Sequence, residues 1–532
     1  MVVPELGPWR AARPRVARLA NAVRPCLSRA VAAVRPKLAQ LPKAVWNGPA
    51  HLPRLPRPRT VRTWQYTAGA ATAGLALAAG VVTAAGPWDA SGQRTAERDR
   101  AAALERSGGA DHHRAGTAAG APRPAPSAAP VLTGLGGATG AVGTKRSAPD
   151  AQAVSDALEP LLDTPALGGG HTAAVVDVTT GERLYDADAG KALVPASTTK
   201  IATAVAALSA LGPDHRLTTR TALEPDTREL VLVGGGDPTL TARARGGGWA
   251  SLRTLAADTA KALRERGIHK ITLSYDTTLF TGPALHPIGV NDNLAPVSAL
   301  TADEGRTDGS SSGPVIRVGD PAADAALRFA GFLKDAGITT TPPGPSKAST
   351  RAQTLARVSS PPLSALVERM LTNSDNDIAE ALARHTALAG GRPASFAGGA
   401  EAIATQLRGL GLPMAGAVFR DGSGLDRADR LTADLLTGLL VRAADPDRPG
   451  LRPVLTGLPV AGFTGTLSNR YADGASGVVR AKTGTLTGVN ALAGTVVDDT
   501  GHLLAFAFLA SGTTDPAQAQ ETLDKAATAL AN

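Results

Sequence analysis

The sequence predicts a protein of the α/β class in an α+β arrangement, with an antiparallel sheet flanked by helices, an inserted α/β module and an N-terminal transmembrane helix. Three apolar segments near the C-terminus, separated by short polar turns, indicate an antiparallel meander. The middle of the chain alternates strand-like and helix-like patterns, which is typical of a separate α/β module. An uncharged run over residues 67–86 has the length of a membrane-spanning helix.

Composition divides the 532 residues into consecutive regions. We expect a basic, mostly disordered cytoplasmic tail, a membrane anchor, a flexible linker rich in Ala, Gly and Pro, and a catalytic domain interrupted by an inserted module. The expected ranges are 1–63 for the tail, 64–88 for the anchor, 89–150 for the linker, 151–219 and 351–532 for the catalytic domain, and 220–350 for the module.

The formal net charge of +9 belongs to the N-terminal tail. Residues 1–63 hold 13 Lys and Arg and one acid, Glu5, so the remaining chain carries a net charge of about −3. Because basic residues mark the cytoplasmic side of a span, we expect a single-pass protein of the cell membrane with an extracytoplasmic catalytic domain. A buried Ala-rich helix is the alternative for residues 67–86. The separation of cations from the folded part argues against nucleic-acid binding.

Cysteine and histidine usage excludes two kinds of site. Cys26 is the single cysteine, so the chain forms no internal disulfide and no Cys-rich metal centre. The nine histidines form no H-x-x-x-H pair. We therefore expect no metal and no cofactor.

Three short motifs follow one another along the chain: STTK at 197–200, SDN at 374–376 and KTG at 482–484. Each motif alone is weak, because such short patterns arise by chance in a long chain. Their order, with each motif in a fitting local context, makes the combined signal strong.

The first motif supplies a candidate nucleophile and its base. Residues 198–211 place apolar side chains on one helical face, with Ser197 at the expected N-cap. Ser197 and Lys200 then lie one turn apart on the same face. A hydroxyl needs a nearby base, and lysine acts as one only when burial or another cation, here Lys482, lowers its pKa. A surface lysine behind a capping serine is the alternative.

The second motif joins two predicted helices, at 363–371 and 378–388, where Ser, Asp and Asn are also ordinary turn residues. In the functional interpretation Ser374 relays a proton between the lysines and a leaving amine. Asn376 then holds the substrate amide, and Asp375 points away and braces the loop.

The third motif lies on a predicted strand, 477–485, along which a substrate would lie. Gly484 permits close approach of a backbone, and Lys482 with the hydroxyls of Thr483 and Thr485 binds a carboxylate. The backbone N–H groups of Thr485 and Ser197 then form an oxyanion hole. An edge strand with solvated Lys and Thr is the alternative.

Over residues 151–532 the chain resembles the D-alanyl-D-alanine carboxypeptidase/endopeptidase family of low-molecular-mass class C penicillin-binding proteins, peptidase family S13. The resemblance is carried by the three motifs and by longer stretches such as VLVGGGDPTL, PPLSALVERMLTNSDNDIAEALAR and FRDGSGLDRADRLTADLL. It implies a penicillin-binding protein/β-lactamase-like transpeptidase fold, with a domain inserted between the first and second motifs. We interpret DGSGL (421–425) as a Gly-rich turn without a catalytic role.

The resemblance implies a serine-type D-Ala-D-Ala carboxypeptidase. It leaves open whether the enzyme also has DD-endopeptidase activity. Such an enzyme trims peptidoglycan stem peptides through an acyl-enzyme on Ser197, and β-lactams acylate the same serine as inhibitors. A β-lactamase or serine esterase of the same fold and a catalytically silent cell-wall binding protein are the alternatives. The expected partners are stem peptides, β-lactams and, through residues 67–86, the membrane, but no nucleic acid.

Overall fold

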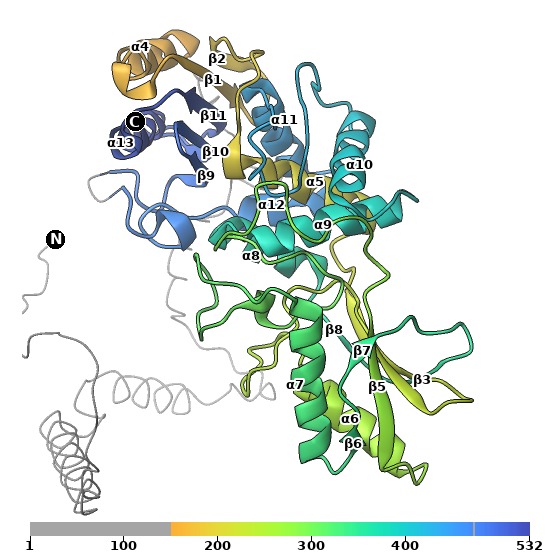
Figure 1. The fold of residues 1–532 in the computed structure, drawn as a ribbon. Coiled ribbons are helices and arrows are strands. Elements are labelled where there is room, and N and C mark those ends of the chain that lie inside the picture. Colours follow the sequence, from red (N-terminus) through yellow and green to blue (C-terminus); the bar gives the residue numbers. More distant parts are fainter. Residues whose placement is uncertain (1–149, 472–473) are drawn as a thin grey trace, which may run out of the picture. The chain divides into compact units, whose positions relative to one another are not determined.

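The computed structural model describes residues 150–471 and 474–532 (Figure 1). The expected tail and anchor, and all but the last residue of the expected linker, lie outside the described residues. Within the described residues, no helix has both the length and the apolar character needed to span a bilayer.

The first sheet has five strands in the order β2-β1-β11-β10-β9. Its strands are β1 (Gly170–Asp177), β2 (Arg183–Ala187), β9 (Arg480–Leu486), β10 (Val489–Val497) and β11 (Leu503–Ser511). All four pairings are antiparallel, and β1 pairs along its full length with β11. The predicted C-terminal meander is confirmed, and it leaves β9, which carries the KTG motif, at the edge of the sheet.

Alternation along β11 separates the two faces of this sheet. Phe506 and Phe508 pack into one cluster with the terminal helices α4 (Ala151–Leu162) and α13 (Pro516–Ala529). The intervening alanines of β11 pack into another cluster, beneath α5 (Thr199–Leu211) and α11 (Ala433–Ala444). Small side chains on this second face let helices approach the sheet closely, which brings the start of α5 near β9.

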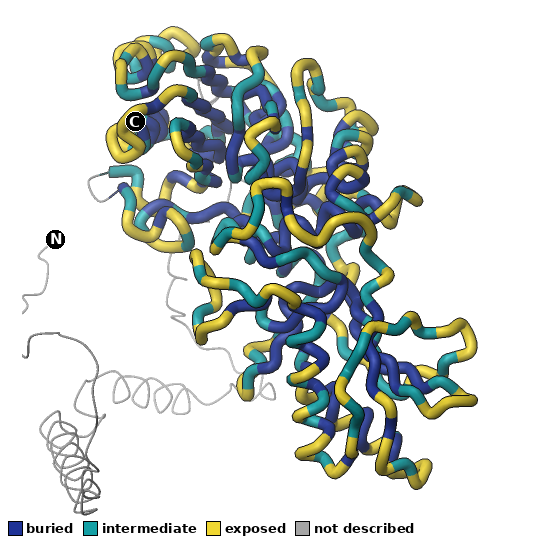
Figure 2. Tube along the Cα trace, viewed as in Figure 1, coloured by how far each residue is buried: buried dark blue, intermediate teal, exposed yellow. Residues whose placement is uncertain are grey.

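Helix α5 (Thr199–Leu211) is the central helix of the catalytic part. It is buried at ten consecutive positions, 199–208, and not only on its apolar face (Figure 2). The reason is that α5 lies between the sheet and a helical lobe that contains α8 (Leu363–Asn373), α9 (Asn376–Ala389) and α10 (Phe396–Gly409). A helix enclosed on all sides excludes water from any polar group that it carries. The short helix α12 (Pro453–Thr456) packs against α8.

The inserted module contains a second sheet in the order β6-β5-β4-β3-β8, with β7 paired to β5. Helices α6 (Leu252–Arg264) and α7 (Pro321–Asp335) contribute to its core. The strands are β3 (Thr218–Leu223), β4 (Glu229–Val233), β5 (Lys270–Asp276), β6 (Thr339–Thr340), β7 (Gly344–Pro345) and β8 (Gln353–Ser359). The sheet therefore extends past both ends of the expected range, 220–350.

Residues 315–318 of the module form no strand. This segment makes a single bridge, between Arg306 and Arg317, and otherwise runs as an irregular loop. Gly313 and Pro314 precede it, and the side chain of Arg317 reaches out of the module to Asp377 on α9. The loop is held by this ion pair and by backbone hydrogen bonds from Val315 to Asp292 and from Val318 to Gly305, not by a strand ladder.

Candidate active site

Ser197 lies in a 3₁₀ turn, Ala196–Thr198, immediately before α5. The prediction that Ser197 caps the helix is wrong: Thr198 occupies the N-cap, and no side chain caps this end. Capping would engage the Ser197 hydroxyl with a backbone N–H. Instead its Oγ lies 3.0 Å from Lys200 Nζ, so the predicted contact across one turn is confirmed.

Lys200 is fully buried and has three oxygen partners. Its Nζ lies 3.0 Å from Ser197 Oγ, and it donates to Asn376 Oδ1 at 2.6 Å and to the carbonyl oxygen of Ser423 at 2.7 Å. Burial lowers the pKa of Lys200 to about 8, although the more distant carboxylates of Asp421 and Glu380 act in the opposite direction. Near neutral pH this amine therefore has an appreciable free-base population, as proton abstraction requires.

The SDN motif forms the connection between α8 and α9. Asp375 caps α9 by accepting from the backbone N–H of Ile378 at 3.0 Å, so it braces the loop as predicted, but it also borders the pocket and does not point away from the site. Ser374 borders the same pocket, and Asn376 is fixed at both ends of its amide. Its Nδ2 donates to the carbonyl of Asn293, on the inserted module, at 2.9 Å.

The KTG motif closes the site from β9. Lys482 is fully buried, and its Nζ donates to Ser374 Oγ at 2.9 Å and to the carbonyl of Thr483 at 2.8 Å. Burial, followed by the positive charge of Lys200, lowers the pKa of Lys482 well below its usual value. Gly484 is required by close approach, because a Cβ there would lie 2.6 Å from the carbonyl oxygen of Pro195.

Two residues beside the reactive hydroxyls have left-handed backbones. Ala196 has φ 49° and Ser374 has φ 58°, values that non-glycine residues seldom adopt. Each such residue costs on the order of 1 kcal/mol, and strain of this kind gathers at functional sites. The left-handed turns direct the hydroxyls of Ser197 and Ser374 into the same pocket.

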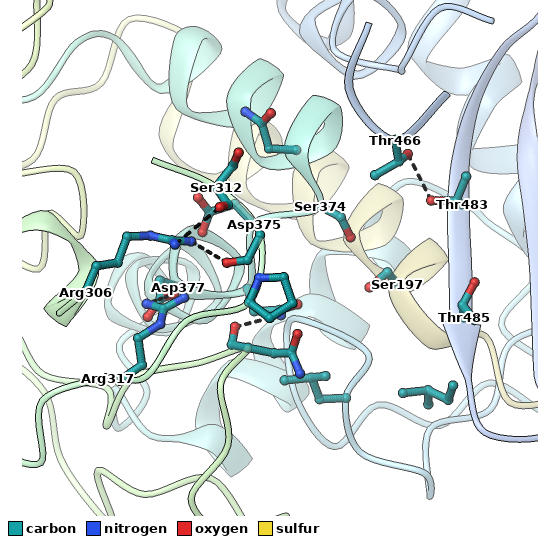
Figure 3. A pocket seen from close by; sticks show the side chains of 17 residues that line it. Ser197, Arg306, Ser312, Arg317, Ser374, Asp375, Asp377, Thr466, Thr483 and Thr485 are labelled. Carbon is teal, nitrogen blue, oxygen red and sulfur yellow. Dashed lines mark hydrogen bonds and ion pairs between the residues drawn. The ribbon is translucent and has the colours of Figure 1, made fainter. Parts of the chain in front are cut away.

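A pocket of about 330 Å³, within the range of small-ligand sites, opens between Ser197, Ser374 and the β9 threonines (Figure 3). Ser197, Ser374, Asn376, Thr483 and Thr485 line it, so five of the eight predicted site residues border one cavity. Lys200 and Lys482 are fully buried and contact the lining hydroxyls of Ser197 and Ser374, and Gly484 brings β9 against the Ser197 turn. All eight predicted residues therefore converge on one site.

The far wall of this pocket was not predicted from the sequence. The wall comes from the inserted module and includes Arg306, Ser312 and Arg317, on the opposite side from the β9 threonines (Figure 3). Thr466 was missed as well; its hydroxyl accepts a hydrogen bond from Thr483 Oγ1 at 3.0 Å. No local signal marks these residues, because only the tertiary fold brings them to the motifs.

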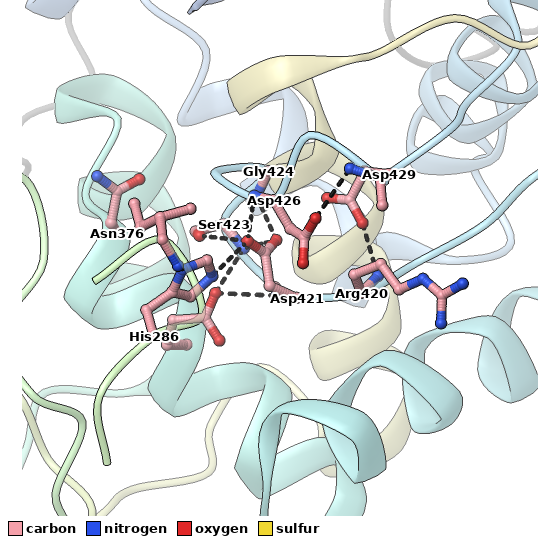
Figure 4. A network of polar contacts seen from close by, with 12 residues as sticks. His286, Asn376, Arg420, Asp421, Ser423, Gly424, Asp426 and Asp429 are labelled. Atoms are coloured by element: carbon pink, nitrogen blue, oxygen red, sulfur yellow. Dashed lines mark hydrogen bonds and ion pairs between the residues drawn. The ribbon is translucent and has the colours of Figure 1, made fainter. Parts of the chain in front are cut away.

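The DGSGL turn also has a role that sequence analysis did not assign (Figure 4). Asp421 accepts from the backbone N–H groups of Ser423 and Gly424 at 3.0 and 2.6 Å, and from that of Asp426 at 2.8 Å. His286 of the inserted module lies 2.9 Å from the same carboxylate. These contacts hold the carbonyl of Ser423 toward Lys200. The sequence did contain an indication of this role. A Gly-rich turn between polar residues is typical of a segment whose backbone must adopt a specific conformation.

Two buried clusters in the described part of the chain have side-chain atoms close enough to hold a metal ion. They are His286 with Glu380 and Asp421, and Glu304 with Asp375 and Asp377. Their oxygens already accept from protein donors, including backbone N–H groups of the DGSGL turn on Glu380 and the guanidinium of Arg317 on Asp377. We assign no metal to either cluster, because protein donors occupy the ligand atoms.

Comparison with known proteins identifies the family of this chain. A model of the D-Ala-D-Ala carboxypeptidase 3 (S13) family matches residues 154–313 and 308–532. Carboxypeptidase DacB of Mycolicibacterium smegmatis is 38% identical over 378 residues, which cover 68% of this chain and 81% of that protein. A carboxypeptidase of Mycobacterium tuberculosis is 36% identical over 412 residues, 75% of this chain and 87% of that protein.

Among solved structures, penicillin binding protein 4 (dacB) of Haemophilus influenzae has the same fold. It superposes with a TM-score of 0.57 at 23% identity, covering 70% of this chain and 98% of that one. The family match extends over both parts of the catalytic domain, the inserted module and all three motifs. The chain belongs to the S13 family of D-Ala-D-Ala carboxypeptidases.

Proposed function

We propose that this chain is a serine-type D-Ala-D-Ala carboxypeptidase that trims peptidoglycan stem peptides through an acyl-enzyme on Ser197. One observation carries the proposal: two hydroxyl–amine pairs face one pocket. Ser197 Oγ lies 3.0 Å from Lys200 Nζ, and Ser374 Oγ lies 2.9 Å from Lys482 Nζ. Family membership supplies the substrate class, and the geometry supports the roles of the individual residues.

Acylation begins with attack of Ser197 Oγ on the carbonyl carbon of the penultimate D-Ala. The free-base form of Lys200 takes the hydroxyl proton as the new C–O bond forms. The C–N bond then breaks, and the departing amine of the terminal D-Ala receives a proton by way of Ser374, which Lys482 can resupply. Water hydrolyses the ester and regenerates the Ser197 hydroxyl, so bonds and protons balance over the cycle.

The edge strand β9 binds the end of the substrate. Lys482 with the hydroxyls of Thr483 and Thr485 binds the terminal carboxylate, whose charge favours a protonated Lys482. The Asn376 amide, held between Lys200 and Asn293, contacts the substrate backbone. The backbone N–H groups of Ser197 and Thr485 stabilise the oxyanion, and each such donor is worth about 3–4 kcal/mol in the transition state.

Incubation with an acyl-D-Ala-D-Ala peptide tests the assignment directly. We expect release of free D-Ala by the wild type and none above background by Ser197→Ala. Intact mass spectrometry with a penicillin should show one covalent adduct, which peptide mapping assigns to Ser197. A persistent adduct supports the peptidase, whereas rapid turnover of the penicillin without D-Ala release would support a β-lactamase instead.

We also propose that residues 67–86 anchor the protein in the cell membrane, with the catalytic domain on the outer side. The uncharged run and the cations that precede it support this proposal. The basic tail then contacts anionic lipid headgroups on the cytoplasmic side. Fractionation and protease accessibility of intact cells test it: deletion of residues 1–88 should release the catalytic domain from membranes, and retention would contradict the anchor.

A further inference from the structure

A second pocket, of about 230 Å³, adjoins the catalytic one. It lies mainly on the inserted module, and no residue of the three motifs lines it. Arg306 borders both pockets, and the second pocket reaches Ser311 where the catalytic pocket begins at Ser312. The two hollows therefore meet at one short segment of the module, so a ligand longer than a dipeptide could extend from one into the other.

The lining of this second pocket has an excess of positive charge. Four arginines and two carboxylates border it: Arg243, Arg245, Arg306, Arg369, Asp303 and Glu304. Burial also raises the pKa of Glu304 to about 7, which further reduces the negative charge at neutral pH. An excess of guanidinium groups in a concave site favours an anionic ligand, and a planar carboxylate matches their geometry.

Three of these arginines are fixed by the protein itself. Arg306 pairs with Glu304 at 2.9 Å, and Arg369 pairs with the same carboxylate at 3.2 Å. Arg243 pairs with Asp303 at 3.2 Å. These ion pairs neutralise the two carboxylates of the lining and fix the positions of the three arginine side chains.

Arg245 differs from the other three arginines. It is exposed at the rim, and among residues 150–471 and 474–532 it has neither an ion pair nor a hydrogen-bond partner. The half-buried indole of Trp249 also lines this pocket, and the guanidinium carbon of Arg369 lies 5.1 Å from the centroid of its ring. An unpaired guanidinium beside a firmly held aromatic wall suits a carboxylate on a peptide with apolar parts.

We propose that this pocket is an accessory subsite for a carboxylate of the wall peptide, beyond the D-Ala-D-Ala segment in the catalytic pocket, with Arg245 as its ion-pair partner. The inference rests on the proposed function and deepens it. Such a subsite makes the enzyme bind long, acidic, cross-linked substrates more tightly than short ones. The subsite adds affinity for the remote part of the substrate and leaves the chemical step at Ser197 unchanged.

Two substrates and two matched variants test the subsite. The substrates are a cross-linked stem-peptide dimer with free carboxylates and an uncharged-side-chain acyl-D-Ala-D-Ala tripeptide. Arg245→Gln should raise KM for the dimer about tenfold at low salt, the scale of one charge-assisted hydrogen bond, with kcat unchanged. Its kcat/KM for the tripeptide should stay within about twofold of the wild type. Arg408→Gln, at an exposed position of α10 outside both pockets, serves as the control.

The second arm uses a dimer whose carboxylates are amidated except for the terminal D-Ala carboxylate, which stays free to bind at β9. The wild type should bind the amidated dimer as weakly as Arg245→Gln binds the free acid, and Arg245→Gln should not distinguish the two. Equal effects of Arg245→Gln and Arg408→Gln, or a full Arg245 effect on the amidated dimer, would overturn the subsite. If the wild type releases no D-Ala from the tripeptide, the proposed function fails. Calorimetric binding of the dimer to Ser197→Ala then still tests the subsite.

Discussion

The pH dependence of acylation tests the role of Lys200. Burial lowers the pKa of this lysine to about 8, and only its free-base form can accept the Ser197 proton. The free-base fraction is about 10% at pH 7, about 50% at pH 8 and about 90% at pH 9 for such a pKa. Activity should therefore rise with pH, about fivefold from pH 7 to 8 and less than twofold from pH 8 to 9.

The assay is the second-order rate constant for acylation by a fluorescent penicillin, measured between pH 6 and 9.5 at constant ionic strength. Penicillin keeps one charge state over this range. The ascending limb of the pH–rate profile, where the rate constant rises with pH, therefore reports ionisation of a group on the enzyme. Lys200→Met has a side chain of similar length without a base and should lower the rate constant by about 10²–10⁴. The variant should also lose the ascending limb. Circular dichroism of each variant shows whether its fold is retained.

Two outcomes would refute this reasoning. A rate constant that stays flat from pH 6.5 to 9 would mean that Lys200 does not titrate in the range that its burial predicts. A Lys200→Met variant with the same limb would assign the titration to another group, of which the buried Lys482 is the first candidate.

Three further predictions concern the turns around Lys200. Ser197→Ala should abolish the penicillin adduct without lowering the melting temperature by more than a few degrees, and a retained adduct would place the nucleophile elsewhere. Gly424→Ala should destabilise the protein by at least about 2 kcal/mol and slow acylation more than tenfold. The reason is that Gly424 has φ 81°, and a Cβ added there would lie 1.9 Å from the carbonyl oxygen of Ala196. Gly409→Ala is the control in chemical denaturation, because a Cβ added at Gly409 meets open space. Asp421→Asn should shift the acylation limb to lower pH by up to about one unit, because the Asp421 charge raises the pKa of Lys200, and an unchanged limb would contradict that coupling.

Sequence alone could predict the parts of the site whose chemistry is local. Ser197 and Lys200 are three residues apart, and the 3₁₀ turn that leads into α5 brings their side chains together as one turn of helix would. The meander that carries Lys482 follows from apolar segments and short turns. Asp375 is a favoured N-cap type before a helical segment, and the structure confirms that it braces the loop.

The rest depended on contacts between segments far apart in the chain. Arg306 and Arg317 reach the pocket because the inserted module packs against α9, where Arg317 meets Asp377 at 2.8 Å. The carbonyl of Ser423 that orients Lys200 is a backbone group, and residue type gives no direct indication of where a carbonyl points. The error at Ser197 has a local origin: Ala196 is left-handed, which residue type does not indicate, and it turns the chain before α5 begins.

The electrostatics of the site explain why two lysines can act in one small space. Lys200 and Lys482 are fully buried, and among the described residues neither forms an ion pair with a carboxylate. Charging both amines at once is unfavourable because each is desolvated and each repels the other. One proton shared across the Ser197–Lys200 and Ser374–Lys482 pairs is the state that burial favours, and it leaves one base and one acid. A substrate carboxylate at β9 then draws the proton toward Lys482 and leaves Lys200 free to deprotonate Ser197. Substrate binding thereby sets the protonation pattern that acylation needs.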